Sequence, residues 1–183
     1  MEARQGISEP LISPYTAGDV AEILASHGWL ATPLQAGDAA VDEWLARAAQ
    51  LLGPHAADRD ALFSLLQLIF CYNATEIARR PDTHAVLVRE GARAVLRALA
   101  HQVLSGGAVD SDRYKEIITS LKAAVPHRGR SLFFPIRLAL AGRPGDGELD
   151  RVILLLDSAS LLPFAAPVKS TRTRILEFCS ALD

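Results

Sequence analysis

The feature that most constrains the fold is a succession of apolar stretches at helical spacing, each closed by glycine or proline. In the clearest stretch, apolar side chains recur three or four residues apart, at Val41, Trp44, Leu45, Ala48, Leu51 and Leu52. This spacing places them on one face of a helix, which Gly53 and Pro54 end. Alanine and leucine dominate, whereas β-branched and aromatic residues are few, which favours helices over sheets. We therefore expect an all-α fold, a helical bundle in two small lobes.

The remaining apolar stretches predict the order of the helices. Asp38 and Asp110 are typical N-cap residues, and either Asp110 or Ser111 should start a helix that runs to about residue 125. Further helices are predicted at 17–27, through the apolar run that ends near residue 72, at 81–104, at 148–157 and after residue 167. Residues 1–14 are interpreted as a flexible arm. A loop at 105–107 would separate an N-terminal lobe, 15–105, from a C-terminal lobe, 108–183.

Charge is distributed unevenly along the chain. The net charge of −2 argues against general nucleic-acid binding. Residues 1–112, however, carry 8 basic and 14 acidic side chains, whereas residues 113–183 carry 11 basic and 7 acidic ones. A basic face confined to the C-terminal lobe is therefore expected. In the 81–104 helix, Arg89, Arg93 and Arg97 would share one exposed side, either a solvated face or a stripe for an RNA backbone.

The sequence also excludes several classes of protein and site. No stretch has the length and apolarity of a membrane span, and the N-terminus lacks the pattern of a signal peptide, so we expect a cytoplasmic protein. Cys71 and Cys179 each lie in an apolar run and are expected to be buried, reduced thiols. The five histidines lack the spacing of metal ligands, so we predict neither a metal nor a cofactor.

The richest stretch runs from His127 to Leu149 and reads HRGRSLFFPIRLALAGRPGDGEL. Its first residues form a cationic loop around Gly129, which permits close backbone approach. Pro135 suits the first turn of a short apolar helix, and Gly142 suits its end. The following glycine-rich loop leads to another helix near Glu148 and should face the same side as Arg137.

The run GRSLFFPIRLALAG, followed by GELDRVILLLD, resembles the signature of the C-terminal anticodon-binding region of bacterial glutamyl-tRNA synthetases. The weaker patterns WLARAAQLL and ALFSLLQLIF resemble the same region, so the likeness covers residues from about 40 to 157. It implies an all-α anticodon-binding fold and tRNA as the partner, a tRNA-Glu-like molecule. The tail from Ser158 to Asp183 lies beyond the likeness.

The resemblance implies roles for individual residues, in which splayed single-stranded bases meet arginine planes, backbone groups and apolar side chains. The expected contacts to anticodon bases are Arg137, Asp146, Gly147 and Leu149, and the expected phosphate contacts are Arg128 and Arg130. Arg143, in the same loop as Asp146, is also expected to bind nucleic acid. Asp146 departs from the family, where a neutral residue is usual, and its carboxylate would repel RNA unless Arg143 pairs with it. Ala141 replaces the usual threonine.

Structural alternatives remain open for these residues. Arg137 either reads RNA or pairs with Asp150 or Glu148. Phe133 and Phe134 are more often core residues than stacking platforms. Lys169, Arg172 and Arg174 lie near the start of the last helix, where positive charge is unfavourable for the helix dipole, and this favours a binding role for them.

The class I catalytic motifs, of the His-Ile-Gly-His and Lys-Met-Ser-Lys-Ser types, are missing, so the chain is not expected to aminoacylate alone. Two functional hypotheses follow. In the first, the chain is a non-catalytic tRNA-binding module that acts in trans or as part of a larger synthetase, beside a catalytic domain. In the second, it is a protein-interaction module with the same fold that has lost RNA binding.

Overall fold

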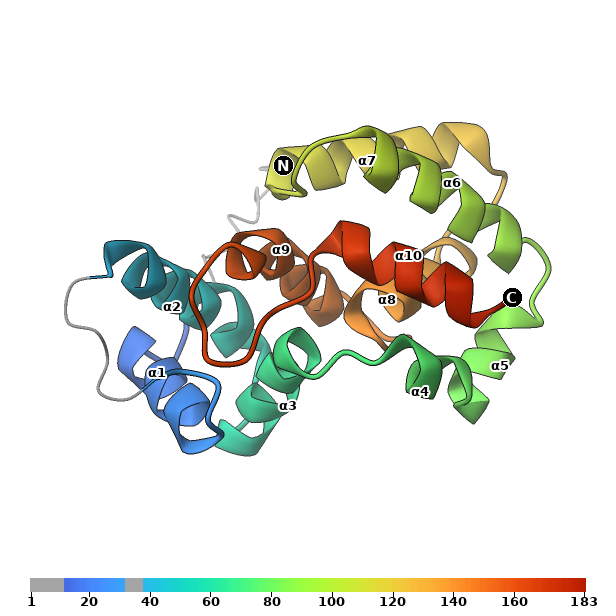
Figure 1. The fold of residues 1–183 in the computed structure, drawn as a ribbon. Coiled ribbons are helices and arrows are strands. Elements are labelled where there is room, and N and C mark those ends of the chain that lie inside the picture. Colours follow the sequence, from blue (N-terminus) through green and yellow to red (C-terminus); the bar gives the residue numbers. More distant parts are fainter. Residues whose placement is uncertain (1–11, 32–37) are drawn as a thin grey trace, which may run out of the picture.

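The computed structural model describes residues 12–31 and 38–183, and in that part all regular structure is helical. The helices are α1 (Ala17–Ser26), α2 (Ala39–Leu52), the 3-10 helix η1 (Gly53–His55), α3 (Arg59–Phe70), α4 (Ala74–Ala78), α5 (Pro81–Leu87), α6 (Ala92–Ser105), α7 (Ser111–Ala124), α8 (Arg130–Ala141), α9 (Glu148–Ser160) and α10 (Thr171–Ala181). The predicted all-α class is confirmed (Figure 1). Of the predicted arm, residues 1–11 lie outside the described residues.

Side-chain caps start the helices where the sequence places them. The Asp38 carboxylate accepts hydrogen bonds from the backbone N–H groups of Ala40 and Val41, and Asp110 accepts one from Arg113. Each bond satisfies a backbone donor that the first helical turn leaves without a partner. Asn73, in an Asn-Ala-Thr sequence, caps α4 in the same way. These starts are local properties of the sequence.

The single helix predicted over 81–104 is two helices. Gly91 separates α5 from α6 and takes a positive φ of 83°, a backbone conformation that an α-helix cannot contain. The turn is tight because the imidazole of His127 lies directly over Gly91, where a Cβ atom would overlap the ring. Arg89 therefore lies in the connection before α6, while Arg93 and Arg97 are exposed on α6.

The helix expected to begin at Pro135 begins five residues earlier, at Arg130. Pro135 lies inside α8, where it cannot donate the hydrogen bond of an ordinary helical residue. The N-cap, Gly129, has no side chain to mark the start. Every residue from Pro135 to Ala141 is buried, so packing stabilises the helix around the missing bond. The predicted end at Gly142 is confirmed by its φ of 91°.

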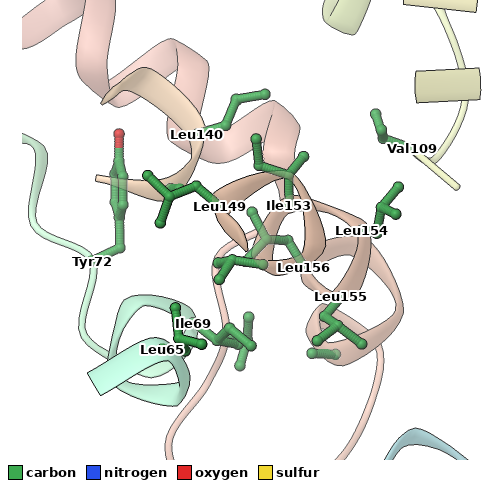
Figure 2. Close-up of a cluster of buried hydrophobic side chains, with 14 of the residues drawn as sticks. Leu65, Ile69, Tyr72, Val109, Leu140, Leu149, Ile153, Leu154, Leu155 and Leu156 are labelled. Atoms are coloured by element: carbon green, nitrogen blue, oxygen red, sulfur yellow. The ribbon is translucent and has the colours of Figure 1, made fainter. Parts of the chain in front are cut away.

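The core is centred on α9, which packs against α2, α3, α8 and α10. Figure 2 shows its leucine and isoleucine side chains meeting residues of α3 on one side and Leu140 of α8 on the other. The indole N–H of Trp44 donates to the carbonyl of Leu155, 3.2 Å away, which ties α2 to α9. The buried apolar cluster thus runs through helices from both halves of the chain. The division into lobes at 15–105 and 108–183 remains a prediction.

The segment after Ser158, expected to lie beyond the family likeness, is part of the packed structure. Helix α10 crosses the middle of the molecule in Figure 1 and contacts α4, α6, α8 and α9. Asp157 accepts hydrogen bonds from the backbone N–H of Val109 and from both the N–H and the hydroxyl of Thr171. One buried carboxylate therefore fixes the loop before α7 and the start of α10.

The binding role favoured for the basic residues at the start of α10 is contradicted for Arg174. Its side chain is 0% exposed, and the guanidinium donates to the carbonyls of Lys169, Leu68, Leu140 and Ile69. Burial lowers its pKa to about 10 despite the nearby negative charge of Asp157. Intramolecular partners also engage the other two side chains, since Lys169 pairs with Glu177 and Arg172 donates to the carbonyl of Leu104.

The expectation that both cysteines are buried is wrong for Cys71. Cys71 is exposed, because it follows the last residue of α3 instead of lying within the helix. Cys179 is half-buried on α10, and both thiols are free. None of the helices in 12–31 and 38–183 is long and apolar enough to cross a bilayer.

Candidate nucleic-acid interface

Helix α8 separates the predicted site residues into two groups. Its 12 residues span about 18 Å at 1.5 Å per residue. Arg128 and Arg130 lie at its first end, whereas Arg143, Asp146 and Gly147 follow its last residue. Arg137 and Leu149 belong to the second group because their contacts are to that end. The predicted residues therefore form two surfaces and not one.

At the second end, Arg137 forms a bidentate ion pair with Asp150. Its Nε lies 2.9 Å from Oδ1 and its Nη2 lies 2.8 Å from Oδ2, while Nη1 donates to the carbonyl of Gly145 at 2.7 Å. Burial would lower the pKa of Arg137, but the hydrogen bond and charge of Asp150 outweigh it and raise the pKa. The guanidinium also lies 4.8 Å from the ring centroid of Phe133. The pairing with Asp150, one of the alternatives raised by the sequence, is thus present in the structure.

Tyr114 completes this network from α7. Its hydroxyl donates to Oδ1 of Asp150 at 2.8 Å, so one carboxylate joins α7, α8 and α9. The sequence gives no sign of this role, because Tyr114 looks like one more member of the apolar stripe of its helix. Only the packing of three helices brings the hydroxyl to the carboxylate.

The loop from Gly142 to Gly147 is fixed through its backbone. Arg80 donates to the carbonyl of Gly142 at 3.1 Å, and Arg137 donates to that of Gly145. Asp146 and Gly147 are exposed and Arg143 is half-buried. No ion pair joins Arg143 to Asp146 in the part of the chain that the structure describes.

Leu149, predicted to meet an anticodon base, is a core residue. Its side chain is 0% exposed and belongs to the cluster around α9 in Figure 2. A Cβ atom added to Gly145 would come within 2.8 Å of Leu149 Cδ1, so the loop lies tightly over this side chain. Leu149 supports the loop from beneath, and its side chain offers no surface to a base in this conformation.

At the first end of α8, the two arginines differ. Arg128 is exposed but turns back to α7, where its guanidinium donates to the carbonyls of Lys122, Val125 and His127. The bonds to Lys122 and Val125 satisfy acceptors at the end of that helix. Arg130 is exposed, and its guanidinium lies 5.7 Å from the ring centroid of Phe134. Of the two, only Arg128 is used to complete the fold.

Two buried tyrosine hydroxyls lead to a prediction about pH. Burial, the largest cause, raises the pKa of Tyr114, and the charge of Asp150 raises it further. Burial also raises the pKa of Tyr72, against the opposing charge of Arg174. In the unfolded chain a tyrosine ionises near its ordinary value of 10.0. The stability that these two protons contribute is therefore present below that pH and lost as the pH rises above it.

We expect Tyr72 and Tyr114 to ionise in the same alkaline step in which helicity is lost. Ultraviolet absorbance of tyrosinate, recorded beside circular dichroism, measures both events. Tyr114→Phe should remove one ionisation from that step, and Tyr72→Phe should remove the other. Ionisation of both hydroxyls while the helical signal stays intact would contradict the prediction.

The described residues hold no group of three or more His, Cys, Asp or Glu side chains placed to bind a metal ion. No protein-family model matches the chain, and no solved structure matches it. Curated proteins do match. The chain is 29% identical over 119 residues to glutamate–tRNA ligase 2 of Syntrophus aciditrophicus (strain SB), which covers 64% of this chain and 24% of that protein.

The relatives of this chain are glutamate–tRNA ligases. The glutamate–tRNA ligase of Bacillus thuringiensis (strain Al Hakam) is 36% identical over 77 residues, 42% of this chain and 16% of the ligase. That of Bacillus licheniformis is 27% identical over 120 residues, 66% of this chain and 24% of the ligase. The chain thus spans about a quarter or less of the length of these relatives. The resemblance seen in the sequence is confirmed as a likeness to one part of a glutamate–tRNA ligase.

Proposed function

We propose that this chain is a non-catalytic tRNA-binding module that contacts the anticodon region, in trans or as part of a larger synthetase. The ligand is a tRNA-Glu-like molecule in the cytoplasm, and a synthetase catalytic domain is the protein that such a module would complete. The likeness to one part of glutamate–tRNA ligases supports this proposal. No membrane takes part.

The observation that carries the proposal is the loop Gly142–Gly147. Its backbone is held by Arg80 and Arg137, while Asp146 and Gly147 are exposed and Arg143 is partly so. A loop fixed before binding loses little conformational entropy when it meets a flexible single-stranded partner. Arg137 acts here by holding the loop, and Arg143 is the cation that meets RNA.

The second candidate function is a protein-interaction module that has lost RNA binding. Two observations favour it. Arg128 and Arg137 use their guanidinium groups within the protein, and Asp146 presents an exposed carboxylate without an ion-pair partner in the described chain. A carboxylate in this loop repels phosphates and would suit a basic protein surface instead.

Two substitutions in the loop, one that removes a positive charge and one that removes a negative charge, distinguish the two candidate functions. If RNA binds the loop, Arg143→Gln should weaken binding by about 1 kcal/mol or more, roughly fivefold, because it removes a contacting cation. Asp146→Asn should strengthen binding, because it removes a repulsive charge. Fluorescence anisotropy with labelled tRNA-Glu transcripts, with and without anticodon changes, measures both.

Arg151→Gln is the matched control. Arg151 is exposed in the first turn of α9 and lines a groove with Arg47 and His55, residues that do not belong to the loop. The substitution removes the same charge from the groove that residues of α2 and η1 line, and it should leave binding nearly unchanged. Equal effects of Arg143→Gln and Arg151→Gln, together with no gain from Asp146→Asn, would sink the anticodon proposal. Absence of any tRNA binding at low salt would favour the protein-interaction candidate.

A further inference from the structure

Two arginines from distant parts of the chain meet one phenylalanine ring. The guanidinium carbon of Arg89, in the connection between α5 and α6, lies 5.8 Å from the ring centroid of Phe134. That of Arg130, at the start of α8, lies 5.7 Å from the same centroid. Both arginines are exposed, and Phe134 is half-buried. We call these three residues the arginine–phenylalanine cluster.

The fold fixes the position of this cluster. Helix α8 packs against both α5 and α6, so the connection that carries Arg89 lies beside the start of α8. The imidazole of His127 covers Gly91 and joins that connection to the segment before α8. The positive φ of Gly91 and the lack of space for a side chain make this approach specific to glycine. The packing of the backbone therefore places Arg89 and Arg130 near the same ring, so their proximity does not depend on side-chain rotamers alone.

The chemistry of the cluster leaves hydrogen-bond donors free. An arginine over an aromatic ring uses the face of its guanidinium, whereas its five N–H donors lie in the plane and can reach an acceptor. Within the described residues, neither Arg89 nor Arg130 makes a side-chain hydrogen bond or an ion pair. Arg128, beside Arg130 in the chain, donates to three carbonyls instead.

The electrostatic surroundings favour an anion at this place. Two like charges on one ring repel each other, and an anionic ligand relieves the repulsion. Glu90, the nearest acidic residue in the chain, is exposed and pairs with neither arginine in the described structure. Helix α8 begins beside the cluster without an acidic residue in its first turn, so the positive end of its dipole is uncompensated.

We propose that Arg89 and Arg130, oriented by Phe134, bind a phosphodiester of an RNA strand. Arginine recognises phosphate through paired N–H donors, which these two side chains offer. The cluster lies at the opposite end of α8 from the Gly142–Gly147 loop, so it forms a second contact that adds affinity without reading sequence. This inference rests on RNA binding as proposed above. It extends the RNA-contacting surface to Arg89 and Phe134, which the sequence did not single out as a pair.

The test measures affinity for a tRNA-Glu transcript and for an unrelated single-stranded RNA across a salt series, by fluorescence anisotropy. Arg89→Gln and Arg130→Gln should each reduce the slope of log affinity against log salt by about 0.7–0.9, the value for one lost phosphate contact. Phe134→Leu changes no charge, but it should also weaken the binding of both RNAs severalfold, because the ring no longer orients the two guanidinium groups. Arg97→Gln is the matched control and should leave the slope unchanged, because Arg97 is exposed on α6 and lies over no aromatic ring of the described residues.

Coupling between the residues gives a stricter criterion. Phe134→Leu should have much less effect in an Arg89→Gln/Arg130→Gln background than in the wild-type chain, since Phe134 acts through the arginines. Urea unfolding midpoints of all variants verify that each is folded at the assay temperature. Wild-type affinity and slope in Phe134→Leu, or a slope change in Arg97→Gln as large as that in Arg89→Gln, would overturn the inference.

The two proposals fail in different ways. If the cluster variants weaken binding to both RNAs while Arg143→Gln and the anticodon changes have no effect, the anticodon proposal is wrong and the phosphate contact stands. If the chain selects tRNA-Glu and the cluster variants bind it as the wild type does, the phosphate contact is wrong and the anticodon proposal stands. If the wild-type chain binds neither RNA at low salt, both are overturned.

Discussion

Replacement of Arg174 by methionine is expected to destabilise the protein by about 3–5 kcal/mol, because each buried polar group left without a partner costs about 1–3 kcal/mol and several are affected. The guanidinium joins the end of α3, the end of α8 and the segment just before α10 through four carbonyl groups. Methionine fills similar volume but donates nothing, so these buried carbonyls lose their partner. Urea unfolding followed by circular dichroism should show a much lower midpoint, or a chain unfolded in buffer.

Arg172→Met is the control for this experiment. Arg172 lies two residues away, is exposed and donates to a single carbonyl, that of Leu104. We expect its replacement to cost about 1 kcal/mol or less. Arg174→Lys retains the charge, but the lysine ammonium cannot reach four acceptors in three directions. Its unfolding midpoint should therefore lie between those of Arg174→Met and Arg172→Met. Equal midpoints for Arg174→Met and Arg172→Met would show that the buried network does not stabilise the fold.

Asp150→Ala is expected to cost about 2–4 kcal/mol, because it leaves Arg137 as a largely buried charge without its counterion. The Arg137 side chain is 11% exposed and that of Asp150 is 24% exposed, so solvent can compensate only in part. Tyr114 loses its acceptor in the same variant. The expected loss of stability should therefore appear with a second effect, release of the loop that Arg137 holds through Gly145.

Two measurements examine these effects. Chemical denaturation gives the loss of stability, and hydrogen exchange of the 142–147 backbone reports the loop. Asp146→Ala, which removes an exposed carboxylate from the same loop, should change stability by no more than about 0.5 kcal/mol. A double substitution, Asp150→Ala with Arg137→Met, should recover part of the stability, since it removes the unpaired charge. An Asp150→Ala variant as stable as Asp146→Ala would contradict the structural role of the pair.

Local signals in the sequence were sufficient where one side chain acts within a few residues. Asp38 and Asp110 start their helices as predicted, because a cap acts on backbone N–H groups two or three residues away. Gly142 ends α8 for a similar reason, since its positive φ is inexpensive only for glycine. The pair between Arg137 and Asp150 could be named as an alternative because short connections placed the two helices next to each other.

Helix boundaries without a local signal were missed. Gly129 caps α8 with no side chain, so the start could not be read, and Pro135 pointed to the wrong turn. In the sequence, Gly91 was compatible with a continuous helix, whereas in the structure His127 lies over it. At Gly91, packing against a distant side chain excludes any larger residue, which local propensity does not encode.

By itself, the sequence determined the all-α class, most helix starts, and the likeness to one part of a glutamate–tRNA ligase. Each of these depends on periodicity, on a cap or on a short ordered motif, and such features act over a few residues. Tertiary structure alone decided that Arg174 is a buried structural residue, that Leu149 belongs to the core, and that Arg89 and Arg130 both lie near the ring of Phe134. The partners of Arg174 at Leu68 and Ile69 lie 106 and 105 residues away in the chain. The exposure of a side chain depends on such distant contacts. The sequence alone therefore could not distinguish a buried structural arginine at the start of a helix from an exposed binding residue.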